Sequence, residues 1–301
     1  MSEPLAYLNG RFLPQSQATL PLHDAGFVMG ATVSDLCRTF HHRFFRWPDH
    51  LARFRRGLQA TGIQPDLSDE QVTNLAHKLV EHNAGLLNKN QDLALVVFAT
   101  PGPIGYYAGL PGGPGEGPPT LGIHTFPLPL KRYQRLFREG ARLAVPTMVR
   151  DYSVDPRAKQ RSRMQWWIAE HMAHEIDAGA SALLPDVDEC VTETATANFL
   201  VVKAGAIISP PANRILGGIS LNVVREFCRE LKIEFVEKPI PLTEAKRAEE
   251  VFLTSTPYCL AGVSRLDGAD IPWPGPITQL LIAKWSEAIN LDFVGQILAA
   301  R

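Results

Sequence analysis

The order of strand-like segments in the second half of this 301-residue chain most restricts its fold. The runs "SALLPD", "CVTETATANFLVV" and "KAGAIISPP" read as strands, and only short turns separate them. Short turns join antiparallel strands, whereas parallel neighbours need a crossover connection of a dozen or more residues. Strict strand–helix alternation is therefore disfavoured, and the sequence predicts an α+β fold with a mixed sheet.

The first half predicts a hairpin, two helices and a buried strand. "LAYLNGRFLP" alternates and turns at Asn9-Gly10, which is typical of a β-hairpin. "DHLARFRRGLQATG" has helical apolar spacing after a cap at Asp49, and "DEQVTNLAHKLVEHN" is a second amphipathic helix. "LALVVFAT" indicates a buried strand, and residues 101–119 are so rich in Pro and Gly that we expect a surface loop.

Later segments complete the expected order of elements. "LGIHTFPLPL" returns to strand character, and its prolines Pro127 and Pro129 indicate a joint between domains. We therefore expect an N-terminal domain over residues 1–128 and a C-terminal domain over residues 129–301. Within the second, "RSRMQWWIAEHMAHEIDAG" and "GGISLNVVREFCRELKI" predict helices, and "EFVEKPI", "AEEVFLTST" and "AGVSRLDG" predict strands.

Composition excludes several classes of partner. The formal net charge is −1, which gives no reason to expect binding to nucleic acid or to a membrane surface. The four cysteines are scattered without a CxxC pair, so we expect neither a zinc site nor a disulfide framework. "MSEPLAYLNG" resembles no signal peptide, and no apolar run approaches the ~20 residues of a membrane span. These features favour a cytoplasmic protein.

One carboxylate stands in an unusual setting. The run "DECVTETATANFLVV", residues 188–202, reads as a single strand with Glu193 among small residues. Carboxylates are depleted in strands and are rarely buried without a partner, so Glu193 predicts a nearby cation. The small neighbours leave room for a flat ring.

A second set of residues predicts an anion site. In "LGGIS", Gly217 and Gly218 let the backbone approach a ligand closely, and Ile219 and Ser220 begin a helix whose N-terminus is positive. Thr256 of "LTSTP" offers a hydroxyl and an amide in a turn after a buried strand. The chain has no GxGxxG or Walker pattern, so a phosphate group fits these residues better than a nucleotide.

Together these segments resemble the class IV pyridoxal-phosphate aminotransferases. That family includes branched-chain aminotransferases, D-amino-acid aminotransferases and aminodeoxychorismate lyase. Its signature is matched by Glu193, Ala195, Asn198 and Phe199. Lys159 precedes Glu193 by 34 positions, the separation found in the branched-chain members. The resemblance implies a two-domain fold, with a smaller N-terminal α/β domain and a larger, mixed β-barrel-like C-terminal domain.

The resemblance also implies a cofactor, pyridoxal 5′-phosphate, and a role for each site residue. Lys159 binds the cofactor covalently and then moves the substrate proton as general acid and base. This lysine must be neutral, and like-charge repulsion from Arg157, Arg161 and Arg163 would lower its pKa. Glu193 binds the ring nitrogen and keeps it protonated. The phosphate is fixed by Arg53 of the "HxxR" segment, Ile219, Ser220 and Thr256.

The expected activity is transfer of an amino group between a branched-chain-like amino acid and a 2-oxo acid by a homodimer. A loop from the second subunit would close the site. Three alternatives stay open: aminodeoxychorismate lyase, D-amino-acid aminotransferase and a non-catalytic relative. Met164 stands where branched-chain members have a tyrosine, and "VVFATPGP" lacks the arginine pattern of the D-amino-acid enzymes. The substrate's side chain and stereochemistry therefore stay undetermined.

Overall fold

The computed structural model describes residues 3–88 and 91–301, and the chain divides into two compact units. Unit 1 comprises Met1–Leu128 and Ala158–Arg163, and unit 2 comprises Pro129–Arg157 and Met164–Arg301. The domain boundary expected after residue 128 stays a prediction. The short segment 158–163 packs with unit 1 although the chain on both sides of it belongs to unit 2.

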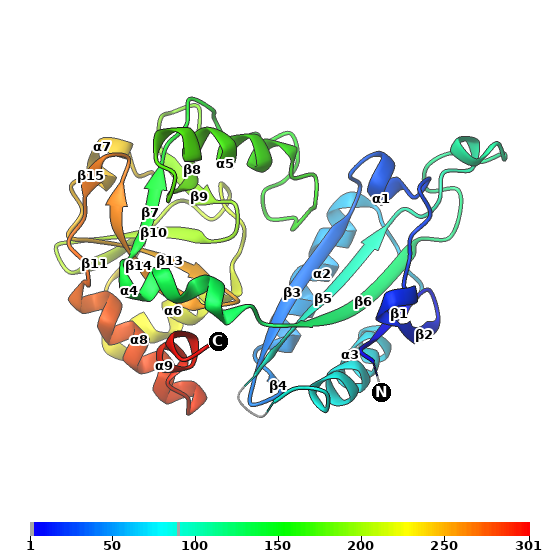
Figure 1. Ribbon diagram of the computed structural model, residues 1–301. Coiled ribbons are helices and arrows are strands. Elements are labelled where there is room, and N and C mark those ends of the chain that lie inside the picture. Colours follow the sequence, from blue (N-terminus) through cyan, green and yellow to red (C-terminus); the bar gives the residue numbers. More distant parts are fainter. Residues whose placement is uncertain (1–2, 89–90) are drawn as a thin grey trace. The chain divides into compact units, whose positions relative to one another are not determined.

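Unit 1 is built on a six-stranded sheet in the order β2-β1-β6-β5-β3-β4 (Figure 1). Its strands are β1 Leu5–Leu8, β2 Arg11–Pro14, β3 Val33–Phe40, β4 Arg43–Phe44, β5 Leu93–Thr100 and β6 Thr120–Pro127. All of these pairs are antiparallel. Asn9 and Gly10 turn the first hairpin with φ of 45° and 89°, so the hairpin predicted there is confirmed.

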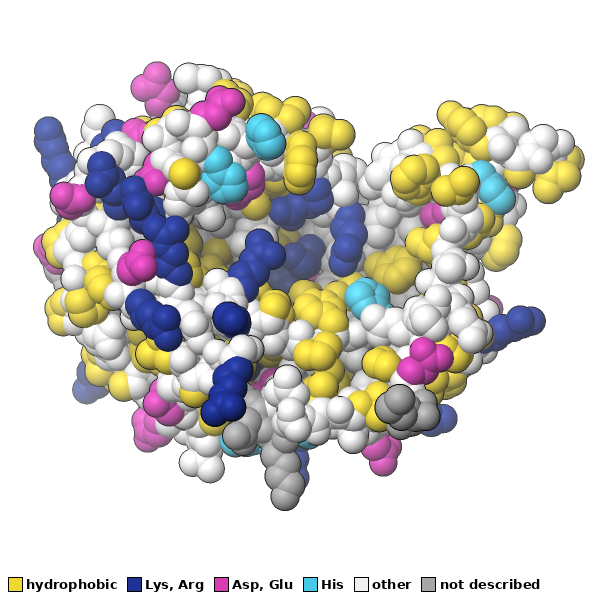
Figure 2. All heavy atoms as spheres, in the orientation of Figure 1, with side chains coloured by type: hydrophobic (Ala, Val, Ile, Leu, Met, Phe, Trp, Pro, Cys, Tyr) yellow, Lys and Arg dark blue, Asp and Glu magenta, His cyan; other side chains and the backbone are white. Residues whose placement is uncertain are grey.

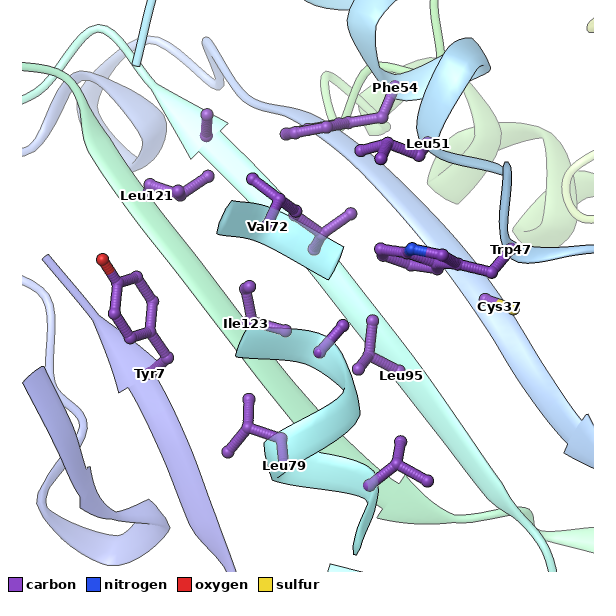
Figure 3. Packing of buried hydrophobic residues seen from close by; sticks show 14 of the residues in the cluster. Tyr7, Cys37, Trp47, Leu51, Phe54, Val72, Leu79, Leu95, Leu121 and Ile123 are labelled. Carbon is purple, nitrogen blue, oxygen red and sulfur yellow. The ribbon is translucent and has the colours of Figure 1, made fainter. Parts of the chain in front are cut away.

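Two helices, α2 Trp47–Thr61 and α3 Asp69–Ala84, cover one face of this sheet. Figure 3 shows apolar side chains of the helices (Trp47, Leu51, Phe54, Val72 and Leu79) packed against those of the strands (Leu95, Leu121 and Ile123). Both helices were expected, but α2 begins two residues before Asp49, which lies in its first turn and is not its cap. A capping box between Ser68 and Gln71 starts α3.

The Pro- and Gly-rich segment between β5 and β6 is irregular apart from one turn of 3-10 helix, Gly105–Ala108. Its tip exposes Tyr106, Tyr107 and Leu110, and Figure 2 shows hydrophobic side chains gathered there. A short helix, α1 Ala25–Val28, and a 3-10 turn, Gln15–Gln17, lie earlier in the same unit.

Unit 2 contains a closed barrel. Its strands are β7 Ala141–Ala144, β8 Ser181–Pro185, β9 Val191–Thr194, β10 Asn198–Lys203, β11 Ala206–Ser209, β12 Phe235–Glu237, β13 Glu250–Ser255, β14 Cys259–Leu266 and β15 Ala269–Asp270. The path β10-β13-β14-β7-β8-β9 closes because Glu193 of β9 pairs with Asn198 of β10. Since β7 runs parallel to both neighbours and the other pairs on this path are antiparallel, the barrel is mixed. The predicted α+β class, with a mixed, barrel-like sheet in the second half of the chain, is confirmed.

The single strand predicted over residues 188–202 is wrong. The chain folds back between Thr194 and Asn198, so that β9 and β10 are separate antiparallel strands. The Thr194 hydroxyl accepts a hydrogen bond from the Ala197 N–H at 3.0 Å, and the Thr194 N–H donates to the Ala197 carbonyl at 3.0 Å. A threonine side chain that bonds the backbone in this way stabilises a tight turn in a segment whose apolar pattern reads as continuous.

The helices of unit 2 are α4 Gln134–Arg138, α5 Met164–Ile176, α6 Ile219–Leu231, α7 Leu242–Ala245, α8 Pro276–Ile289 and α9 Phe293–Leu298, with a 3-10 turn at Leu130–Tyr133. The expected amphipathic helix at α6 is confirmed, whereas α5 begins at Met164, three residues later than expected. Within residues 3–88 and 91–301, no helix combines the length and the apolar character that crossing a bilayer requires.

A second carboxylate inside a strand has a structural role. Glu250 of β13 is 2% exposed, and its two oxygens accept the N–H groups of Ile277 and Thr278 at 2.8 Å each. The Thr278 hydroxyl also donates to it at 2.7 Å. The N-cap residue of α8 is Gly275, which has no side chain that could cap the helix. Glu250 therefore takes the place of an N-cap and places a negative charge at the positive end of the helix.

Replacing this carboxylate by its amide tests that role. In Glu250→Gln one acceptor oxygen becomes an NH2 group that cannot accept the helix N–H, so we expect the free energy of unfolding to fall by about 1–3 kcal/mol. Urea denaturation measures the change. Glu287→Gln, on the exposed face of the same helix, is the control and should stay within about 0.5 kcal/mol of wild type. Equal losses in the two variants would contradict the capping role.

Candidate active site

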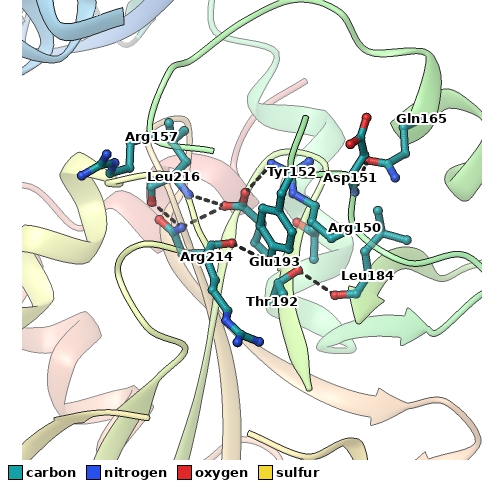
Figure 4. A network of polar contacts seen from close by, with 12 residues as sticks. Arg150, Asp151, Tyr152, Arg157, Gln165, Leu184, Thr192, Glu193, Arg214 and Leu216 are labelled. Carbon is teal, nitrogen blue, oxygen red and sulfur yellow. Dashed lines mark hydrogen bonds and ion pairs between the residues drawn. The ribbon is translucent and has the colours of Figure 1, made fainter. Parts of the chain in front are cut away.

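Glu193 lies at the centre of a polar network in unit 2. The residue is 5% exposed, and its Oε1 forms an ion pair with Nη2 of Arg150 at 3.1 Å. Its Oε2 accepts the Asn198 side-chain amide at 3.2 Å and the Leu216 N–H at 3.1 Å. Figure 4 shows these contacts converging on the carboxylate. Arg150 thus supplies one cation beside Glu193, and the contact of Glu193 with a cofactor ring stays a prediction.

Arg150 was not anticipated from the sequence. It lies in an irregular segment after β7, where no periodic pattern indicates which side chains point inward. Its backbone N–H donates to the Pro185 carbonyl at 2.7 Å, and its guanidinium stacks 4.8 Å from the ring of Trp166 in α5. The strand end and the aromatic ring hold the guanidinium against Glu193.

The same network reaches the start of α6. The Leu216 carbonyl accepts the Asn198 side-chain amide at 2.8 Å, while its N–H bonds Glu193. Two residues later, Gly218 is the N-cap of α6, and as a glycine it has no side chain to form a capping bond. A Cβ on Gly218 would overlap with Oδ1 of Asn198, so only glycine fits here. Ile219 and Ser220 follow as the first helical residues, with their N–H groups at the positive end.

The end of β13 adds hydroxyl groups beside Asn198. Thr254 pairs directly with Asn198 across the strands, and its buried hydroxyl has no hydrogen-bond partner among the residues described. Ser255 donates to the Thr196 carbonyl at 2.7 Å, which ties this strand end to the β9–β10 turn. Thr256 is half-buried just beyond the strand. Unit 2 therefore places Glu193, the start of α6 and the end of β13 in one neighbourhood.

Unit 1 holds Arg53 in a buried cluster with Asp35 and His50. Arg53 donates to Asp35 through Nε at 2.7 Å and through Nη2 at 2.8 Å. Nδ1 of His50 lies 2.8 Å from Asp35 Oδ1. The "HxxR" segment predicted Arg53 alone. Its histidine, His50, lies three residues earlier on the same helix face and could have been predicted with it. Asp35 on β3 was not expected to join them.

Burial and charge set the ionisation of this cluster. Burial alone would raise the pKa of Asp35, but the Arg53 charge and the hydrogen bonds from Arg53 and His50 lower it well below 3.8. Burial lowers the pKa of His50 below 6.5, and the charges of Arg53 and Lys159 add to this, against the opposing effect of Asp35. The cluster is therefore an ionised Asp35–Arg53 pair with a neutral histidine that donates from Nδ1.

Lys159 lies on a short segment that pairs with the start of β3 in unit 1. The Lys159 carbonyl accepts the Ser34 N–H at 2.9 Å, and the Arg161 N–H donates to the Thr32 carbonyl at 2.8 Å. Val33 and Gln160 form the antiparallel bridge between these bonds. This pairing uses backbone groups that a helix would need, which explains why α5 starts only at Met164.

The structure thus brings the candidate residues together in two groups. In unit 2 Glu193 is linked through Asn198 and Leu216 to the helix that begins with Ile219 and Ser220, and Thr256 follows the neighbouring β13. In unit 1 Arg53 and Lys159 both lie beside β3, since Asp35 and Ser34 are its residues. The roles assigned to these residues stay predictions.

Comparison with known proteins identifies the family. The family described as Amino-transferase class IV matches residues 32–266. D-alanine aminotransferase of Staphylococcus aureus strain N315 is 27% identical over 281 residues, which cover 91% of this chain and 94% of that protein. A putative branched-chain-amino-acid aminotransferase of Methanocaldococcus jannaschii is 27% identical over 288 residues, 93% of this chain and 95% of that protein.

Solved structures share the fold. The branched-chain aminotransferase of Escherichia coli superposes with a TM-score of 0.84 at 18% identity and covers 98% of this chain and 96% of its own. That of Thermoproteus uzoniensis gives a TM-score of 0.81 at 22% identity, with coverage of 98% and 96%. The chain belongs to the class IV aminotransferases, which depend on pyridoxal phosphate.

Proposed function

We propose that this class IV aminotransferase acts on branched-chain-like amino acids and the corresponding 2-oxo acids, as a homodimer with Lys159 as its cofactor-binding lysine. The observation that carries the site assignment is the link from Glu193 through Leu216 to the start of α6, because it joins an acid to an anion site. The 34-residue separation of Lys159 and Glu193 favours the branched-chain activity.

A second candidate, D-amino-acid aminotransferase, is favoured by the relatives named D-alanine aminotransferase. The chain differs from the pattern of those enzymes, because the segment from Val96 to Pro103 contains no arginine. Aminodeoxychorismate lyase shares the cofactor, and Met164 at the usual tyrosine position keeps it as a third candidate. The methionine begins α5 with its side chain exposed.

The residues present fit pyridoxal phosphate. A phosphate needs several donors. The N-cap residue of α6 is Gly218, which has no side chain to bond the first N–H groups of the helix. The buried Thr254 hydroxyl, which has no partner within the described part of the chain, adds a donor beside them. Arg53, Ile219, Ser220 and Thr256 would hold the phosphate, and Glu193 would hold the protonated ring nitrogen. When bound, the cofactor supplies an electron-accepting ring.

The protein groups supply position and proton transfer. Lys159 removes the proton from the substrate Cα and returns it during amino transfer, as a general base and acid. Glu193 keeps a proton on the ring nitrogen, and Arg150 fixes the direction of its carboxylate. Asp35 orients the Arg53 guanidinium through two hydrogen bonds, which limits the entropy lost when Arg53 binds an anion.

The exposed tip of the 101–119 loop supports the homodimer. Tyr106, Tyr107 and Leu110 are each more than half exposed there. Aromatic side chains exposed in a cluster favour contact with another protein surface, and a second copy of the chain is the occupant we propose.

Lys159→Ala tests the lysine. We expect the visible absorbance of the covalently bound cofactor to disappear and turnover to fall more than about 100-fold, because proton transfer loses its base. Absorbance spectra and a coupled assay of amino transfer measure the two effects. Lys131→Ala, at an exposed lysine of unit 2, should leave both unchanged. Retention of the absorbance band by Lys159→Ala would reject the assignment.

Substrate class is decided by offering each candidate donor to the purified holoenzyme. L-leucine with 2-oxoglutarate should react faster than D-alanine, and aminodeoxychorismate should release no pyruvate. Faster reaction of D-alanine would favour the D-amino-acid activity, and pyruvate release would favour the lyase. Protein that stays colourless and takes up no added cofactor would indicate a non-catalytic relative.

The pH dependence of stability tests the neutral state of His50. Since the folded pKa is lowered, the unfolded chain binds the proton first, and stability is lost as the pH falls below 6.5. Between pH 7 and pH 5 this histidine should contribute at most about 2 kcal/mol of that loss. The lowered pKa of Asp35 adds a further loss only below pH 3.8.

His50→Asn keeps a donor for Asp35 but cannot titrate, so its free energy of unfolding should fall less between pH 7 and pH 5 than that of wild type. Urea denaturation at each pH measures the slope. His82→Asn, on the exposed surface of α3, is the control and should keep the wild-type slope. The interpretation fails if His50→Asn loses stability as steeply as wild type.

A further inference from the structure

Amino acids and 2-oxo acids share an α-carboxylate, and the protein needs a cation or several donors to bind it. The chain contains no arginine between Arg56 and Arg132, so that stretch offers no guanidinium for this purpose. Three other arginines near the candidate residues are already paired with acids. Arg53 binds Asp35, Arg150 binds Glu193 and Arg157 binds Asp155.

Arg161 differs from these three. Within the part of the chain that the structure describes, no carboxylate forms an ion pair with it. Its Nε donates to the Ser34 hydroxyl at 2.9 Å, and Ser34 is 4% exposed on β3, so the anchor is rigid. The bond through Nε leaves the two terminal nitrogens directed away from it. Arg161 keeps an exposed surface, and partial burial lowers its pKa, with no negative charge to counter this effect.

The pairing with β3 anchors Arg161 and Lys159 at the same place in unit 1. The Lys159 carbonyl and the Arg161 N–H both bond β3, on either side of the Val33–Gln160 bridge. The Gln160 N–H also donates to the Ala158 carbonyl at 2.9 Å, so the chain turns tightly at Lys159. Ser34 contacts both residues, since its N–H bonds the Lys159 carbonyl and its hydroxyl accepts Nε of Arg161. The Arg161 guanidinium is therefore held at the same residue of β3 as the Lys159 backbone.

We propose that Arg161 binds the α-carboxylate of the substrate. The proposal rests on the function proposed above, since it needs Lys159 to act at the Cα of the same substrate. A guanidinium donates two parallel hydrogen bonds to a carboxylate, and the pair fixes both oxygens. With the carboxylate held, the Cα–H bond has few orientations relative to the Lys159 amine. Arg161 is thus a substrate-binding residue, and Ser34 positions it.

Amino acids compared with amines of the same side chain isolate this contact. The probes are L-leucine with 3-methylbutylamine and D-alanine with ethylamine, each offered to the holoenzyme. In Arg161→Met we expect kcat/KM for the amino acid that wild type accepts to fall about 10- to 150-fold, mainly through KM, the range for a hydrogen bond to a charged group. The value for the matching amine should fall much less, because the amine lacks the carboxylate and is affected only by the loss of a positive charge near Lys159.

A binding measurement gives a readout that does not depend on turnover. 4-Methylpentanoate and propanoate carry the carboxylate but no amino or oxo group, so neither can react. Calorimetry should show that Arg161→Met weakens the binding of the acid that wild type binds about 10- to 150-fold. The matching amides, 4-methylpentanamide and propanamide, should bind wild type and variant alike.

Arg157→Met is the matched control, because Arg157 is also two positions from Lys159 and carries the same charge, but is paired with Asp155 on the surface. It should leave the preference for amino acid over amine unchanged. The proposal is overturned if Arg161→Met slows amino acid and amine equally, if Arg157→Met has the same effect, or if wild type shows no preference. Failure of the proposed function is distinguishable, because Lys159→Ala would then keep its visible absorbance.

Discussion

The pairing of Glu193 with Asn198 is the contact on which the rest of unit 2 depends. It closes the strand barrel, since β9 meets β10 through these two residues. The same two side chains bind the N–H and the carbonyl of Leu216, which fixes where α6 begins. Barrel closure and the position of a helix N-terminus are therefore set by one acid and one amide.

Buried carboxylates in this protein share a common arrangement. Glu193 and Glu250 both lie in strands, and each accepts backbone N–H groups from the start of a helix or from the loop before it. Their positions differ in one respect that matters for function. Among the residues that the structure describes, Glu250 accepts only neutral donors and caps the helix, whereas Glu193 also faces the Arg150 guanidinium. A charged partner compensates for the cost of burying a carboxylate that must stay ionised.

Periodic patterns predicted much of the fold, including the first hairpin, α3, α6 and the strands β5 and β13. The turn inside residues 188–202 was missed, because a single threonine hydroxyl makes it and the apolar pattern continues on both sides. Glu193 and the start of α6 could be chosen from residue type and spacing. Arg150 and Asp35 could not, since tertiary contacts alone bring an irregular segment and a strand residue to their partners.

The segment around Lys159 has a consequence for how the chain can be divided. The chain passes from one unit to the other after residues 128, 157 and 163, so three covalent links join the units. A fragment ending at residue 128 would lack the backbone partner of Thr32 and Ser34 and would expose that stretch of β3. During synthesis, about 120 further residues must be translated after β3 before the segment that covers this edge is made. At typical translation rates this takes some 6 to 24 seconds. Unit 1 is in this sense completed late by its own downstream sequence.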